Sequence, residues 1–151
     1  MGFKAAEPDF AARTRASFAR QNVMKLLGAR LSRVEPGRVE ITLPFRDDLT
    51  QQHGFFHAGV TSTIADSAGG YAAFTLFPAD ATVLTTEYKI NLLAPADGQS
   101  LRAVGRVVKP GRTLSVCDVE VFVDKGGAER LCAKMLQSLI ALSGRSDDRA
   151  R

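Results

Sequence analysis

The sequence predicts an α+β domain in which one antiparallel sheet wraps a single long helix. The first observation is the segment 60–77, which is rich in Ala and Gly and contains no Lys, Arg or Glu. Such a segment is typical of a helix enclosed on most sides. The second observation is a series of four strand-like runs after it, whose joints are too short for parallel crossovers and so indicate antiparallel neighbours. One sheet curled around one helix accommodates this order.

Length and charge narrow the class of protein. The 151 residues fit one domain over 1–151, long enough to bury a substantial core. The formal net charge of +4 comes without a dense Lys/Arg patch, so we expect no nucleic-acid partner, although an anionic small ligand is compatible. Residues 1–6 do not read as a secretory signal, and no run is apolar enough for a clear membrane span. Cys117 and Cys132 predict buried free thiols, which fit a cytoplasmic protein.

The N-terminal segment 8–27 predicts an amphipathic helix, because Pro8 and Asp9 open it, apolar residues recur at helical spacing, and Gly28 ends it. Beyond it the period changes to that of strands, with turn-forming residues at the joints. We expect the charged segment 143–151 to be a disordered tail. The expected strands are 29–34, 38–44, 82–93, 100–108, 113–124 and 130–142.

The strand expected at 113–124 shows the alternation of a sheet with one buried face. Val119 and Val121 share one side, and Asp118 and Glu120 fall mostly on the other. A sheet of such long strands leaves at least one edge to cover. Joining two copies edge to edge would cover it, so we expect a homodimer or a homotetramer.

The candidate site is a polar loop, 51–59, which carries both histidines of the protein and runs into the long helix. The first turn of a helix leaves backbone N–H groups without intrahelical partners, and these groups favour negative charge. A thioester carbonyl aimed at the helix start would be polarised, and the oxyanion formed on attack would be stabilised. Ala58 and Gly59 suit this place because small side chains let a ligand approach the backbone.

Asp66 is the acid of the long helix and follows His57 by nine residues. A carboxylate in an enclosed helix is costly unless it is paired or used. One interpretation is a paired structural carboxylate, or one that faces a subunit interface. The other is a carboxylate in a cleft that acts as nucleophile or as general base on water. The residues alone leave both interpretations open.

Other chemistries are less well supported by the pattern. His53 and His57 are four residues apart, but a Gly-containing loop without a third ligand nearby does not indicate a metal site. Ser62 and Ser67 lie within the expected helix without a G-x-S-x-G elbow, and no glycine motif for dinucleotides or phosphates is present. We therefore expect neither a metal nor a cofactor.

Residues 30–142 resemble the PaaI-like acyl-CoA thioesterases of the hotdog-fold superfamily, in which an antiparallel sheet wraps a central helix. The family pattern is an Asn or Gln, then His-Gly-Gly, then an acid inside the helix. Gln51, His57, Gly59 and Asp66 match it, whereas Ala58 stands where the family usually has Gly. The resemblance also rests on two further stretches, Val83-Leu84-Thr85-Thr86-Glu87 running into Leu93-Ala94-Pro95, and Lys109-Pro110-Gly111-Arg112-Thr113.

The resemblance implies a role for each matched residue. Asp66 would be the nucleophile or the general base, and the Ala58 N–H would hold the thioester oxygen. Gln51 would help position the thioester or the water. His57 would shape the loop and hydrogen-bond near the carbonyl. The site would lie between two subunits, with Asp66 facing the loop of the partner.

The resemblance also suggests contacts to the substrate. Thr85 or Thr86 would supply a hydroxyl that orients the water. Lys109 and Arg112 are candidates for the coenzyme A phosphates, with a solvated hairpin tip as the alternative. Aromatic side chains could line an acyl pocket, and Phe56 is our candidate among them. The alternative is that these side chains belong to the core; the others are Phe55, Tyr71 and Phe74.

The leading hypothesis from the sequence is a cytoplasmic acyl-CoA thioesterase. One alternative is an acyl-thioester dehydratase or hydratase on the same fold, in which His57 would be paired with Asp66. The other alternative is a non-catalytic module that binds acyl-CoA.

Overall fold

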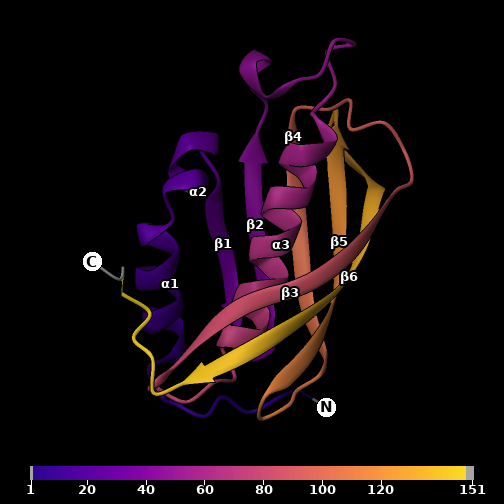
Figure 1. The fold of residues 1–151 in the computed structure, drawn as a ribbon. Helices are drawn as coiled ribbons and strands as arrows, with labels where there is room; N and C mark the ends of the chain where they lie inside the picture. The colour runs from indigo at the N-terminus through magenta and orange to yellow at the C-terminus, as the bar shows by residue number, and fades with distance from the viewer. Residues whose placement is uncertain (1, 149–151) are drawn as a thin grey trace.

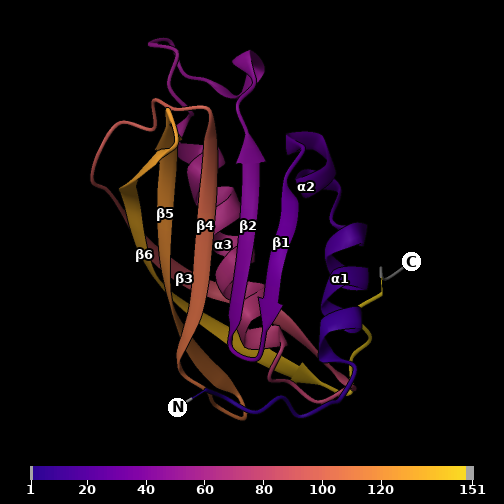
Figure 2. The same cartoon turned by 180° about the vertical axis from the view of Figure 1, so that it is seen from behind.

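The computed structural model describes residues 2–148 and contains a six-stranded antiparallel sheet that wraps a long helix (Figure 1). The strand order is β1-β2-β4-β5-β6-β3. In Figure 1, β3 and β6 cross in front of α3, and Figure 2 shows the other strands on its far side. The predicted α+β fold is confirmed. The elements are α1 (Phe10–Arg20), α2 (Asn22–Leu27), β1 (Arg30–Glu35), β2 (Arg38–Pro44), the 3-10 turn η1 (Asp47–Leu49), α3 (Ala58–Phe74), β3 (Ala81–Leu92), β4 (Ser100–Lys109), β5 (Leu114–Lys125) and β6 (Ala128–Ser143).

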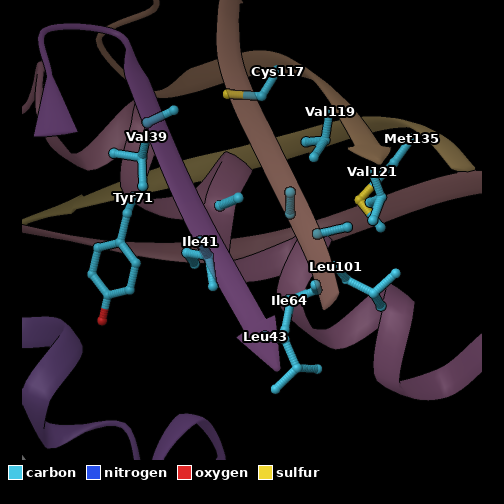
Figure 3. Close-up of a cluster of buried hydrophobic side chains, with 14 of the residues drawn as sticks. Val39, Ile41, Leu43, Ile64, Tyr71, Leu101, Cys117, Val119, Val121 and Met135 are labelled. Atoms are coloured by element: carbon cyan, nitrogen blue, oxygen red, sulfur yellow. The ribbon is translucent and has the colours of Figure 1, made fainter. Parts of the chain in front are cut away.

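The hydrophobic core lies between α3 and the concave face of the sheet (Figure 3). Along β5 the predicted alternation is confirmed, since Val119 and Val121 are fully buried. The outward residues Asp118 and Glu120 of β5 form ion pairs instead. Glu120 lies 2.8 Å from Arg106 of β4, and Asp118 lies 3.1 Å from Lys134 of β6. The period-2 pattern therefore buries one face of the sheet and gives the other a charged surface.

Helix α3 packs closely on the sheet because small residues line the contact. A Cβ on Gly105 of β4 would overlap the carbonyl of Ala68, and a Cβ on Gly69 of α3 would overlap the side chain of Gln137. Ile64 and Ala68 are fully buried in this interface. The richness in Ala and Gly that predicted an enclosed helix thus reflects direct contact between α3 and the strands.

The N-terminal segment differs from the prediction of one helix over 8–27. The structure breaks it at Gln21, whose backbone is extended (φ −73°, ψ 104°), so that α1 and α2 are separate helices. The break is stabilised by a tertiary contact, because the Gln21 side-chain oxygen accepts a hydrogen bond from Ser67 of α3 (3.0 Å). Phe18 of α1 packs edge-on against Tyr71 of α3. The two helices therefore cover the flank of α3 (Figure 1).

The predicted disordered tail, 143–151, is corrected in part. Ser143 still belongs to β6, and Asp147 accepts hydrogen bonds from Arg20 (2.7 Å) and Thr82 (2.7 Å). The negative charge of Asp147 is thus paired with Arg20 of α1, and the chain as far as residue 148 lies against the domain. Residues 149–151 lie outside the described part of the chain.

Strand β3 forms one edge of the sheet. It pairs with β6 along one side, and no other described strand pairs with it. Large apolar side chains on it are exposed, including Leu84, Tyr88 and Leu92. A long apolar edge of this kind is a template for pairing with another chain. Within residues 2–148, none of the helices has the length and apolar character that crossing a membrane requires.

Candidate active site

The start of α3 presents one backbone donor without a protein partner. His57 is the N-cap residue, and its Nδ1 accepts a hydrogen bond from the Gly59 N–H (2.8 Å). The His57 carbonyl accepts from the N–H groups of Val60 (3.0 Å) and Thr61 (3.1 Å). Of the first-turn donors, only the Ala58 N–H has no acceptor in the described chain, and Ala58 is exposed. This N–H is therefore available to an external oxygen.

His57 shapes this helix start through its ring and its backbone. Because Nδ1 accepts the hydrogen bond from the Gly59 N–H, the neutral ring carries its own proton on Nε2. The backbone N–H of His57 donates to the carbonyl of Leu49 (2.9 Å), which ties the loop to the end of η1. The imidazole thus fixes the direction of the first helical turn.

Gln51 closes the loop before α3. Its side-chain oxygen accepts hydrogen bonds from the backbone N–H groups of His53 (2.5 Å) and Phe55 (3.4 Å). The amide nitrogen of Gln51 remains the group that can meet a ligand.

Gln51 and Ala58 border the same depression, which we call the helix-start hollow. It is lined by Gln51, Phe55, Phe56, Ala58, Thr61, Leu92, Leu93, Ala94, Pro95, Ala96 and Cys132.

Asp66 lies in the middle of α3 and is partly buried. Its Oδ1 accepts hydrogen bonds from the Thr85 hydroxyl (2.7 Å) and from the Gln137 amide nitrogen (2.5 Å). No donor within residues 2–148 reaches its Oδ2. One carboxylate oxygen of Asp66 is thus paired inside the protein, as the structural interpretation expected, and the other has no donor among residues 2–148.

Only one of the two candidate threonines meets this carboxylate. The pairing of β3 with β6 shifts register between Thr85 and Glu87, which places a β-bulge at Thr86. Thr85 turns toward Asp66, while the Thr86 hydroxyl donates to the backbone carbonyl of Ser138 (3.0 Å). Bulges commonly re-aim a side chain in this way.

Gln137 is a site residue that sequence reasoning missed. It occupies an inward position of β6 between Met135 and Leu139, and 1% of its surface is exposed. A signal was present, because an amide at an inward position among apolar neighbours must find a buried partner. To predict which group is that partner, one must know how α3 packs against β6.

Asp66 borders a second depression, which we call the Asp66 hollow. It is separate from the helix-start hollow in one protomer, and polar groups line much of it. Burial raises the pKa of its Tyr71 hydroxyl to about 12, so this group stays protonated at neutral pH. The lining residues are Gln21, Asp66, Ser67, Gly70, Tyr71, Val83, Leu84, Thr85 and Asp147.

The remaining predicted residues lie elsewhere. Lys109 and Arg112 flank the turn between β4 and β5, where Arg112 borders a depression beside Leu76 and Phe77, at the C-terminal end of α3. One protomer therefore does not bring them to Ala58. Phe56 lines the helix-start hollow but is 3% exposed and packs edge-on against Phe45, so it contributes to both pocket and core.

Neither cysteine is activated as a nucleophile, although Cys132 borders the helix-start hollow. Both are buried free thiols, and burial raises the pKa of Cys117 to about 12 and that of Cys132 to about 11. A thiol that stays protonated at neutral pH is a poor nucleophile. In the described chain, no three His, Cys, Asp or Glu side chains gather as a metal-binding group, so His53 and His57 have no third ligand there.

Comparison with known proteins identifies the family. A family model described as the thioesterase superfamily matches residues 53–129. The chain belongs to the thioesterase superfamily. An archaeal relative from Saccharolobus solfataricus, whose name marks it as a candidate esterase, is 33% identical over 116 residues, which span 77% of this chain and 80% of the relative. The 1,4-dihydroxy-2-naphthoyl-CoA hydrolase of Escherichia coli is 26% identical over 111 residues, spanning 74% of this thioesterase-superfamily chain and 79% of the hydrolase.

Solved structures agree with this assignment. A thioesterase family protein from Silicibacter pomeroyi is similar with a TM-score of 0.88 and 51% identity, covering 89% of this chain and 99% of that one. The PaaI protein of Escherichia coli, from its phenylacetic acid degradation operon, shares the fold, with a TM-score of 0.79 and 18% identity over 90% of this chain and 95% of that one. The predicted hotdog fold and the resemblance to PaaI-like thioesterases are confirmed.

Proposed function

We propose that this member of the thioesterase superfamily is an acyl-CoA thioesterase, which hydrolyses an acyl- or aryl-CoA thioester to the carboxylic acid and coenzyme A. One observation carries the proposal: Asp66 is held through Oδ1 by two donors, and its Oδ2, which no donor among residues 2–148 reaches, borders an open hollow. Membership of the superfamily supports a thioester substrate. A CoA hydrolase among the relatives supports coenzyme A as the thiol.

Asp66 can act by either of two routes. As a nucleophile, Oδ2 bonds to the thioester carbon, the C–S bond breaks, and coenzyme A leaves as a thiolate. Water then cleaves the mixed anhydride to give the acid and restore the carboxylate. As a general base, Asp66 takes a proton from the attacking water and returns it to the thiolate sulfur. In both routes the oxyanion accepts a hydrogen bond from the Ala58 N–H, beside the positive end of the helix dipole.

These contacts require two copies of the chain. Ala58 and Asp66 are eight residues apart on one helix, a rise of about 12 Å at 1.5 Å per residue. The carbon and oxygen of a carbonyl are about 1.2 Å apart, so one thioester cannot meet both groups of the same helix. We therefore assign Asp66 to one subunit and the Gln51–Ala58 loop to a second. The exposed apolar edge at β3, next to both hollows, supports such a dimer.

The proposal also extends to substrate contacts and to location. The Gln51 amide nitrogen would position the thioester or the water, with Gly59 giving the ligand room. We assign Lys109 and Arg112 as the cations that bind the coenzyme A phosphates. Both residues lie outside the helix-start hollow. The two free thiols fit a reducing compartment, so we place the enzyme in the cytoplasm.

Replacing the proposed catalytic acid tests the function. Asp66→Asn keeps the acceptor for Thr85 and Gln137 but removes the negative charge, so we expect the fold to survive and kcat to fall by about 100-fold or more. The measurement is thiol release from acyl-CoA thioesters, from acetyl to palmitoyl together with phenylacetyl and hydroxybenzoyl. Thermal unfolding of the variant serves as the control.

Three outcomes would contradict the proposal. The first is near-wild-type turnover by Asp66→Asn. The second is an enoyl product without free thiol, which would favour the dehydratase or hydratase. The third is tight acyl-CoA binding without turnover by the wild-type chain, which would favour the binding module.

A further inference from the structure

The Gln137 side chain is a buried amide with an unbalanced set of contacts. The two N–H groups of its nitrogen are shared among three acceptors: Asp66 Oδ1 (2.5 Å), the Asp66 backbone carbonyl (3.1 Å) and the Thr85 hydroxyl (3.1 Å). Its oxygen is buried and has no hydrogen-bond partner among the described residues. Turning the amide over would set its oxygen against the carboxylate, so the charge on Asp66 selects the observed orientation.

This arrangement is locally unfavourable for packing. A buried acceptor without a partner is rare, and the neighbouring inward positions of β6 are apolar. A methionine or leucine at 137 would match Met135 and Leu139 and leave no polar atom unpaired. An amide thus occupies a position where the core alone would favour an apolar side chain.

Gly69 on α3 makes room for this amide. A glycine in the middle of a helix lowers stability relative to alanine. Here a Cβ would overlap the Gln137 oxygen and come within 2.9 Å of Val119. Gly69 thus lowers the stability of α3 at the point where Gln137 packs against it. The glycine and the unpaired Gln137 oxygen both lower stability, and both are explained if the Gln137 nitrogen must reach Asp66.

We propose that Gln137 is a positioning residue for the hydrolytic reaction, and that Gly69 is the gap in α3 that admits it. This inference rests on the proposed role of Asp66. Gln137 and Thr85 both bind Oδ1, and Gln137 also contacts the Asp66 carbonyl, so the carboxylate is held in one rotamer. Oδ2 is then the one oxygen that can meet the thioester carbon or the water. The Gln137 nitrogen also orients the Thr85 hydroxyl. It donates a hydrogen bond to Thr85 Oγ1, and this hydroxyl in turn donates to Asp66 Oδ1.

The test is Gln137→Met, which keeps the length of the side chain and removes both polar atoms. Loss of the restraint misplaces the reacting oxygen, so we expect kcat to fall by about 100-fold while KM changes little. We expect the melting temperature to be unchanged or higher, because the unpaired oxygen is gone. Met135→Leu, at the adjacent inward position of β6, is the matched control and should keep wild-type kcat.

A double-mutant cycle separates positioning from a general structural effect. In the Asp66→Asn background, Gln137→Met should lower the residual rate no further, because the group that it positions is already inactive. Gly69→Ala gives a second route, since it displaces the same amide from the helix side and should also lower kcat more than it raises KM.

The outcomes distinguish this inference from the proposed function. Wild-type kcat in Gln137→Met, or an equal loss in both backgrounds of the cycle, would overturn the positioning role even if Asp66→Asn is inactive. Full activity of Asp66→Asn would instead overturn the proposed function.

Discussion

At the scale of single residues, the proposed chemistry depends on which oxygen of the Asp66 carboxylate is already hydrogen-bonded. Asp66 has donors on Oδ1 and none from the described chain on Oδ2. Thr85 and Thr86 are adjacent and chemically identical, yet the β-bulge sends one hydroxyl to Asp66 and the other to a backbone carbonyl. Adjacent residues thus provide a matched pair for mutation.

We predict that Thr85→Val lowers kcat by about 10-fold or more, because a hydrogen bond to a charged group contributes about 1.5–3 kcal/mol. Thr86→Val should leave kcat within a factor of about two, since its hydroxyl bonds the backbone carbonyl of Ser138 and does not contact Asp66. Steady-state kinetics of thiol release compares the two. Equal losses in both variants would be incompatible with a direct role for Thr85.

The residues that sequence could and could not predict differ in where their partners lie. Asp66, His57 and Ala58 stand in one continuous stretch, so spacing and the helix start indicated them. Gln137 depends on a contact between β6 and α3, 71 residues apart in the chain, and no local pattern supplies that pairing. The choice between Thr85 and Thr86 likewise needed the bulge in the register of β3.

At the scale of elements, the sheet was predictable because its signals are local. Alternating apolar residues and turn formers placed all six strands to within one or two residues of their observed ends. The break between α1 and α2 could not be predicted in this way. Gln21 is an ordinary helix-forming residue, and its extended backbone is stabilised by a hydrogen bond from Ser67 of α3. Tertiary contact overrode local propensity there.

The close contact of α3 with β4 predicts opposite effects for two glycines. Gly105→Ala should lower the free energy of unfolding by about 1–3 kcal/mol or more, because its Cβ would overlap the Ala68 carbonyl. Gly70→Ala should raise it by up to about 1 kcal/mol, because its Cβ meets only Leu139 at an ordinary 3.7 Å and alanine favours the helix. Urea unfolding measures both. A Gly105→Ala protein as stable as the wild type would show that the contact is looser than described.

At the scale of the whole molecule, two independent features point to a second copy. The β3 edge is long, exposed and apolar, which favours pairing of the sheet across two chains. The spacing of Ala58 and Asp66 along α3 would prevent one protomer from completing the proposed reaction. The two hollows border β3 at Leu92 and at Leu84 respectively, so an edge-to-edge dimer could place the Asp66 hollow of one copy beside the helix-start hollow of the other.

The helix start offers a variant that removes the proposed oxyanion donor, the Ala58 N–H, and little else. Ala58 is the first residue of α3, a position where proline is favoured, and the His57 backbone (φ −62°, ψ 140°) suits a residue before proline. Ala58→Pro should therefore keep the fold and delete the free N–H. Ala58→Gly, which keeps that N–H, is the matched control and should stay active.

Complementation between two inactive variants tests the central claim, a hydrolytic site shared by two subunits. Ala58→Pro and Asp66→Asn chains carrying different affinity tags are co-expressed, and the heterodimers are isolated through both tags. Each heterodimer holds one site with an intact Asp66 and an intact Ala58 N–H, so we predict about half of the wild-type kcat per dimer, while both homodimers are inactive. Heterodimers as inactive as the homodimers would contradict the account, because they would place both groups of the site in one subunit.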